Sequence, residues 1–167
     1  AAVPRLDRVR RSLPDGALTT VHVGRFDRTA FALSVVPIQP CSTLVEWCTA
    51  AGAEHAIVGG FYMRPGGPPL GDLWVDGKAL PSTPFDSPWD RCRACVHADA
   101  GSVALVAREE IEGSQRGDLL QAGPMLVREG AISVHPGVDA EGFSAGSRQF
   151  DSDISAGRYP RAALGLA

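Results

Sequence analysis

The stretch AIVGGFYMRPGGPPLGDLWVDGKAL, residues 56–80, gives the most direct indication of the fold. It begins with an apolar run and then contains six glycines and three prolines around a Val-Asp-Gly-Lys segment. Glycine lets another backbone or a ligand approach closely, and proline stiffens the path between such points. Asp-Gly between apolar residues is a strong hairpin signal. The stretch therefore predicts a buried strand at 55–62, a shaped loop, and a β-hairpin at 72–80.

The segments around this stretch predict an α+β (mixed α/β) fold, a largely antiparallel sheet assembly with few helices. Alternating apolar residues indicate strands, and Gly-containing turns join them into hairpins. Thr43 and Glu46 form a capping-box pattern that starts a helix, and Gly52 ends it. We expect one domain over residues 1–167, or the N-terminal part of one. The other predicted strands and hairpins lie at 18–26 paired with 30–38, at 94–107 and at 118–133.

Composition and charge exclude several classes of partner. With 167 residues, 44% hydrophobic and 21% charged, the chain is typical of a globular domain. Its formal charge of −3 gives no electrostatic case for nucleic acid. No apolar run approaches the roughly 20 residues of a membrane helix. Four arginines lie between residues 5 and 11, but Asp7 and Asp15 interleave with them, which indicates a solvated amphipathic start.

The four cysteines leave the redox compartment open. Disulfides, a zinc site and free thiols all fit two closely spaced pairs, although no His spacing supports zinc. Cys48 is expected on the inner face of the helix as a small core residue. Cys41 lies just before that helix, so a 41–48 bridge would exceed the limit of about 7 Å between Cα atoms, and we predict that it does not form. The pairs are Cys41 with Cys48 and Cys92 with Cys95.

The last segment, RYPRAALGLA at 158–167, has the pattern of a core strand that stops on an apolar residue. Domain ends are usually polar and exposed. We therefore expect the sheet to be completed by a C-terminal half that is missing here, on a partner chain or on a segment that continues after Ala167. A strand that simply ends at the sheet boundary is the alternative.

Taken singly, the reactive side chains predict no chemistry. The sequence contains no G-x-S-x-G elbow, Walker loop, dinucleotide fingerprint or H-E-x-x-H pattern. Asp151 and Asp153 fit either a carboxylate pair or the edge of a calcium site, although a solvated turn is the commoner role of such a segment.

The order of four segments carries more information than any one of them. GAEHAIVGGFY, PLGDLWVDGK, LLQAGPMLVREG and RYPRAALGLA follow one another, and together they resemble the phosphodiester glycosidase family over roughly residues 18–167. Members of that family remove a sugar from a phosphodiester. The matching residues are Gly59, Gly60, Phe61, Gly71, Asp76, Gly77, Lys78, Gln121, Ala122, Gly123, Pro124, Leu126, Gly130, Arg158, Pro160, Arg161, Ala162 and Gly165.

The resemblance implies a hydrolase that cleaves a glycosyl phosphodiester in a glycan or polysaccharide. Arginine binds such an anion with permanent charge and two parallel hydrogen bonds. We therefore expect Arg158 and Arg161 to be catalytic, with no metal and no cofactor. A secreted or cell-envelope location is favoured, with a cytoplasmic one left open. The expected substrate-binding residues are Gly59, Gly60, Phe61, Gln121 and Gly123.

Two departures from the family pattern keep other functions open. Val58 stands where the family has Asn, and Ala162 where it has Thr. The family's acidic Asp-Gly-Gly-Gly-Ser-Ser segment is absent, so a catalytic acid is expected beyond Ala167. One alternative is a processed two-chain hydrolase whose nucleophile lies on the partner chain. The other is a noncatalytic carbohydrate-binding module.

Overall fold

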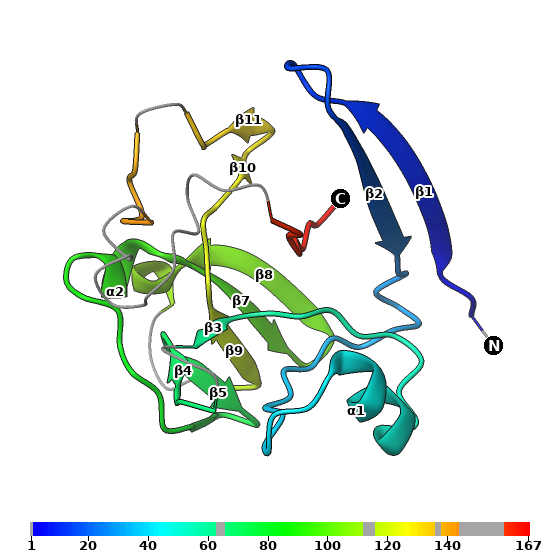
Figure 1. The fold of residues 1–167 in the computed structure, drawn as a ribbon. Helices are drawn as coiled ribbons and strands as arrows, with labels where there is room; N and C mark the ends of the chain where they lie inside the picture. The colour runs from blue at the N-terminus through cyan, green and yellow to red at the C-terminus, as the bar shows by residue number, and fades with distance from the viewer. Residues whose placement is uncertain (1, 63–65, 112–115, 136–137, 144–158) are drawn as a thin grey trace. The chain divides into compact units, whose positions relative to one another are not determined.

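The structure is a computed structural model that describes residues 2–62, 66–111, 116–135, 138–143 and 159–167 (Figure 1). The chain divides into an N-terminal unit, Ala1–Leu33, and a second unit, Ser34–Ala167, and each is described here by itself. Within the described residues, none of the helices has the length and apolar character needed to cross a membrane.

The N-terminal unit is a two-stranded antiparallel ribbon. Strand β1 (Arg5–Ser12) pairs with β2 (Leu18–Arg25), and Val9 lies opposite Val21. The predicted partner of β2 was wrong, because residues 30–38 contain no strand. The arginine-rich start, which was expected to be solvated and amphipathic, is mostly exposed and forms the strand that pairs with β2. A Pro-Asp-Gly turn at 14–16 explains this, since Gly16 has φ 83° and its N–H donates to the Leu13 carbonyl at 2.9 Å.

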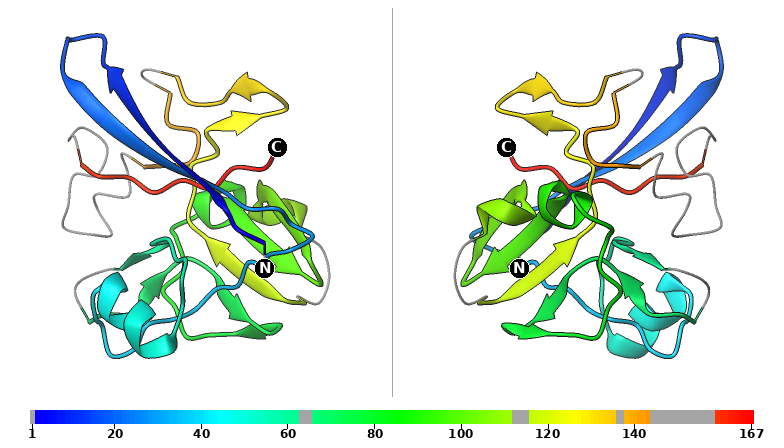
Figure 2. Two further views of the ribbon diagram at one scale, coloured as in Figure 1. Left: turned by 90° about the vertical axis from the view of Figure 1, so that its right-hand side faces the viewer. Right: turned by 90° about the vertical axis from the view of Figure 1, so that its left-hand side faces the viewer.

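The second unit is built on a five-stranded antiparallel sheet in the order β6-β5-β9-β7-β8. Figure 2 shows it from two further directions, with its strands in green and yellow. This confirms a largely antiparallel fold with few helices. The strands are β5 (Leu73–Val75), β6 (Lys78–Ala79), β7 (Ala94–Asp99), β8 (Ser102–Ala107) and β9 (Asp118–Gln121).

Tight turns with two positive φ angles close the predicted hairpins. Asp76 and Gly77 join β5 to β6 with φ 49° and 73°, and Ala100 and Gly101 join β7 to β8 with φ 46° and 82°. Such turns match the twist of the strands they connect. Both hairpin predictions are confirmed. The third predicted hairpin, over 118–133, is shorter than expected. Its first part is β9, which pairs with β5 and β7 instead. Only β10 (Val127–Arg128) and β11 (Ala131–Ile132) pair with each other around the turn.

Helix α1 (Leu44–Ala51) begins and ends as predicted. The Thr43 side chain accepts the N–H of Glu46, the Glu46 carboxylate accepts the N–H of Thr43, and Gly52 ends the helix with φ 65°. Hydrogen bonds from the backbone and side chain of Thr43 hold the pKa of Glu46 below its ordinary value. The predicted burial of Cys48 was wrong, because α1 has no buried residue and Cys48 is half-buried.

The expected buried strand at 55–62 is also corrected. Only β3 (Phe61–Tyr62) forms, paired with β4 (Pro69–Leu70), and Ile57 and Val58 are 53% and 60% exposed. Residues 55–60 belong to no strand, so their apolar side chains lack the neighbouring strands that would cover them. Residues 159–167 likewise form no strand, and Leu164 and Leu166 are exposed. A strand supplied by a partner or a continuing segment stays a prediction.

The core of the second unit lies where the Gly-Pro loop meets the sheet. Leu70 and Phe85 are buried together, and Phe61 and Trp89 pack against them. Trp89 opens the short helix α2 (Trp89–Cys92), and the 3-10 turn η1 (Arg108–Glu110) follows β8. All four cysteines are free thiols, and burial raises the pKa of Cys95 to about 12.

Candidate functional site

The glycine pair of the predicted site lies directly over β9. A Cβ added to Gly59 would be 2.6 Å from Cδ2 of Leu120, and one added to Gly60 would be 3.1 Å from Cδ1. Gly60 also has φ 73°. Gly60 needs glycine for its positive φ, whereas a side chain at Gly59 would require the end of the Leu120 side chain to move.

Phe61 continues this segment into the core. It lies opposite Leu70 in the β3–β4 ladder and packs against the Leu70–Phe85 cluster. Its ring meets that of Phe143 edge-on, with 6.0 Å between ring centroids. Phe61 thus fixes the glycine pair to the core and to the segment that contains Phe143.

Gln121 is buried at the end of β9, with 1% of its surface exposed. Its Oε1 accepts the N–H of Asp72 at 3.1 Å, and its Nε2 donates to the carbonyl of Asp90 at 2.8 Å. Its backbone N–H donates to the Asp72 carbonyl at 2.8 Å. The side chain thereby joins the loop before β5 to helix α2, so the structure gives Gln121 a positioning role.

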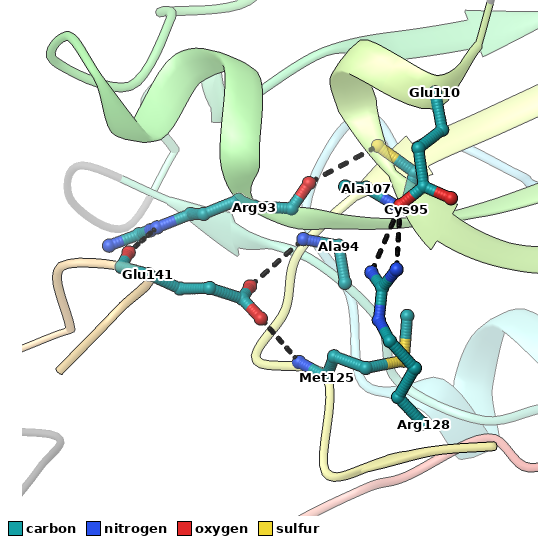
Figure 3. A network of polar contacts seen from close by, with 8 residues as sticks. All are labelled: Arg93, Ala94, Cys95, Ala107, Glu110, Met125, Arg128 and Glu141. Atoms are coloured by element: carbon teal, nitrogen blue, oxygen red, sulfur yellow. Dashed lines mark hydrogen bonds and ion pairs between the residues drawn. The ribbon is translucent and has the colours of Figure 1, made fainter. Parts of the chain in front are cut away.

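Gly123 makes room for a carboxylate. It has φ 63°, and a Cβ at this position would be 2.3 Å from Oε2 of Glu141. That carboxylate accepts the N–H of Ala94 at 2.9 Å and the N–H of Met125 at 2.7 Å (Figure 3). Glu141 therefore fastens its own segment to the start of β7 and to the chain after β9.

A buried arginine lies beside this carboxylate. Arg93 is 1% exposed, and it donates from Nε to the Glu141 carbonyl at 2.7 Å and from Nη2 to the Gly142 carbonyl at 2.9 Å. Its guanidinium carbon lies 3.8 Å from the ring centroid of Phe85 and 4.3 Å from that of Phe143. Burial lowers the pKa of Arg93, and the nearby charge of Glu141 opposes this effect. Arginine still remains a cation at neutral pH.

A second carboxylate fastens the β10 segment in the same region (Figure 3). Glu110 accepts hydrogen bonds from the N–H of Ala107 at 3.1 Å and from both terminal nitrogens of Arg128 at 3.0 Å. The backbone of Ala107, followed by Arg128, holds the pKa of Glu110 below its ordinary value. Both Glu110 and Glu141 therefore act as anchors for segments that leave the sheet.

Charged side chains of both signs surround a hollow of about 330 Å³ whose lining includes Asp72 and Asp90, the two residues that Gln121 contacts. Arg108 pairs with Asp72 at 2.6 Å, and Arg91 lies 3.8 Å from Glu109. In the part of the chain that the structure describes, no group of three or more His, Cys, Asp or Glu residues is placed to hold a metal ion. The hollow is lined by Asp72, Pro84, Asp90, Arg91, Arg108, Glu109 and Ile111.

This lining has the chemistry to bind a polar, charged ligand. Arginines bind phosphate or carboxylate oxygens, and carboxylates accept hydrogen bonds from hydroxyl groups or transfer protons. Gln121 contacts the backbone of Asp72 and Asp90, so the buried amide sets the spacing of two walls of the hollow. A second hollow, of about 430 Å³, lies along α1 and includes Leu44, Val45 and Cys48.

The predicted arginines are not placed in this hollow. Arg158, like Asp151 and Asp153, lies outside the described residues. Arg161 is exposed, and its guanidinium carbon lies 5.3 Å from the ring centroid of Tyr159. The structure thus gathers Gly59, Gly60, Phe61, Gln121 and Gly123 around the end of β9 and leaves the role of the two arginines as a prediction.

Sequence reasoning missed the charged residues of the hollow. They come from the loop before β5, from α2 and from the η1 turn, so no fixed spacing connects them. One local signal was available, because Gly71 with φ 87° places Asp72 directly after a tight bend against Phe85. Comparison of the chain with protein-family models, with curated proteins and with solved structures finds no match.

Proposed function

We propose that this protein is a hydrolase that cleaves a glycosyl phosphodiester, a sugar 1-phosphate diester within a glycan or polysaccharide. One observation carries the proposal: the Gln121 side chain joins Asp72 and Asp90 at the hollow that Arg91 and Arg108 also line. Such a substrate needs cations for its phosphate and carboxylates near its sugar. The substrate class itself is inferred from the four ordered segments that resemble the phosphodiester glycosidase family.

Arg108 is the proposed phosphate ligand of the hollow. Its side chain is 22% exposed and its Nε is held by Asp72, so a bound phosphate would approach a guanidinium of fixed orientation. A guanidinium binds phosphate oxygens through two parallel N–H donors. Arg91 is a second candidate for the phosphate ligand, and it is less constrained than Arg108 because its side chain is 72% exposed. Arg158 and Arg161 are proposed as further phosphate ligands on the strength of the ordered motifs.

The carboxylates of the hollow are the proposed proton-transfer groups. Hydrolysis adds OH to the sugar C1 and H to the phosphate oxygen, so it releases a free sugar and a phosphomonoester. Glycoside cleavage of this kind uses a pair of carboxyl groups around an oxocarbenium-like transition state. Asp72 and Asp90 are the candidates in this chain, and a further acidic group from a partner chain or continuing segment is part of the proposal.

The bond that breaks gives the sharpest test. The protein is incubated with a sugar 1-phosphate methyl diester in ¹⁸O-labelled water, and the products are analysed by mass spectrometry. We expect the label in the released sugar, with a phosphomonoester free of label. Label in the phosphate, or substrate binding without any turnover, would rule out the proposed reaction, and the second result would favour the carbohydrate-binding module.

Variants then test the hollow itself. Asp72→Asn and Arg108→Lys should each lower kcat/KM at least tenfold, about 1.4 kcal/mol, because one removes a carboxylate and the other the two-donor geometry. Glu54→Gln, an exposed carboxylate outside this hollow, is the matched control and should keep normal turnover. If all three variants behave alike, the hollow is not the site.

A further inference from the structure

The β1–β2 ribbon has two faces, and the only acidic side chain among its paired residues, Asp7, lies on just one of them. Side chains alternate along a strand, and the register places Arg8 opposite His22 and Arg10 opposite Thr20 on one face. Every side chain of this face is exposed. We call it the basic ribbon face, and it consists of Leu6, Arg8, Arg10, Ser12, Leu18, Thr20, His22 and Gly24.

The opposite face contains three arginines, Arg5, Arg11 and Arg25, and one carboxylate. Asp7 lies there, and it forms ion pairs with Arg5, at 3.2 Å, and with Arg25. Across the described part of the chain, no carboxylate pairs with Arg8 or Arg10. The basic ribbon face therefore presents two guanidinium groups with their charge uncompensated.

The charge of the whole chain is distributed unevenly. The N-terminal unit contains six arginines and three aspartates, a net charge of +3. The second unit contains ten basic and sixteen acidic residues, a net charge of −6, and the two together give the −3 of the chain. The near-neutral total therefore conceals a basic ribbon, and an anionic partner fits this unit electrostatically.

We propose that the basic ribbon face binds an anionic polymer with repeating phosphodiesters, a phosphate-linked glycan. The choice of polymer rests on the proposed function. Arg8 and Arg10 are two residues apart on one strand, so their Cα atoms are about 7 Å apart and their charges form a row along an extended ligand. Leu6 and Leu18, 67% and 76% exposed, add apolar surface for the C–H faces of sugar rings.

A second copy of the chain is a weaker candidate for this face, although its second unit is acidic. Many of those carboxylates are occupied within the unit. Asp72, Glu109 and Glu110 pair with arginines, while Asp118 and Glu141 accept backbone N–H groups. A polymer of sugar phosphates offers a regular row of charges without such competition. An isolated two-stranded ribbon is also only marginally stable in water, so an extended ligand along it would stabilise it.

Binding is measured by fluorescence anisotropy with a labelled polymer of hexose 1-phosphate units, and dextran serves as the neutral polymer. Arg8→Gln/Arg10→Gln should weaken binding at least tenfold and reduce the slope of log K against log salt by about one for each arginine. Arg8→Lys/Arg10→Lys keeps the charge and should stay within about threefold. Arg28→Gln, which removes an arginine of the same unit outside both strands, is the matched control and should change affinity less than about twofold.

Four results would overturn the proposal. They are unchanged affinity in the double Gln variant, equal binding of dextran, equal loss of affinity in Arg28→Gln, and binding of single-stranded DNA as tight as that of the glycan. Sedimentation that shows self-association lost in the double Gln variant would assign the face to a second copy instead. Circular dichroism checks that the variants fold. If the double Gln variant does not fold, the single variants Arg8→Gln and Arg10→Gln decide, because each should lower the slope of log K against log salt by about one. The anisotropy assay reports binding and does not depend on hydrolysis. If the ribbon binds the polymer but the protein does not hydrolyse it, only the proposed function is refuted.

Discussion

Replacing Glu141 by Gln should destabilise the second unit strongly, although Glu141 is not a core residue. The carboxylate accepts two backbone N–H groups, from Ala94 and from Met125. Gln keeps one acceptor oxygen but turns an NH₂ group toward the other N–H. The side chain is also the negative group that most favours the charged form of the buried Arg93. One substitution thus removes a charge-assisted hydrogen bond and a compensating charge.

The size of the effect follows from these two losses. A hydrogen bond to a charged group contributes about 1.5–3 kcal/mol, and an N–H left unpaired in the interior costs a similar amount. Ala94 is 8% exposed, so water does not easily replace the lost acceptor. We expect Glu141→Gln to lower the free energy of unfolding by about 2 kcal/mol. Glu141→Ala removes both acceptors and should cost about 4 kcal/mol.

Urea denaturation followed by tryptophan fluorescence measures this change. Trp89 is a suitable reporter, because the backbone of Gly142, next to Glu141, lies against its ring. Glu54→Gln makes the same chemical change at an exposed position and should stay within about 0.5 kcal/mol of the wild type. If Glu141→Gln loses no more stability than this control, the carboxylate does not hold the segment and the reasoning is wrong.

Three further predictions concern other parts of the chain. Gly142→Ala should lower the free energy of unfolding by about 2 kcal/mol or more, measured by the same denaturation, because Gly142 has φ 70° and a Cβ would lie 2.2 Å from the Trp89 ring. The buried Cys95 thiol has a raised pKa, so its neutral form stabilises the fold fully below the unfolded value near 9, and this stability should be lost as pH rises toward about 12; a Cys95→Ala variant should lack that pH dependence. Arg161→Lys should slow hydrolysis of a sugar phosphodiester more than tenfold, about 1.4 kcal/mol, while the melting temperature stays unchanged; normal turnover would make Arg161 structural.

Short-range signals predicted the elements that depend on a few neighbouring residues. The capping box at Thr43 and Glu46 satisfies helix N–H groups within one turn of chain. Asp76–Gly77 adopts two positive φ angles that fit only a tight hairpin. Such features carry their own physical cause, so the sequence alone identifies them.

Features that depend on distant segments were not predictable in the same way. Both 5–12 and 30–38 alternate well enough to pair with β2, and only the Pro-Asp-Gly turn favours the first. The apolar run at 56–58 resembles a core strand, but burial needs neighbouring strands that a local pattern does not specify. The hollow collects its charges from separate segments, and long-range pairs such as Arg108 with Asp72 leave no periodic trace in the sequence.

The Gln121 amide has a consequence for how tightly a ligand can bind. Because one planar amide contacts both Asp72 and Asp90, we expect the two walls to keep their separation when a ligand binds. A ligand that binds there should then lose little affinity to the ordering of loops. The heat-capacity change on binding should accordingly match the ligand's own buried apolar area, with no added contribution from folding of the walls.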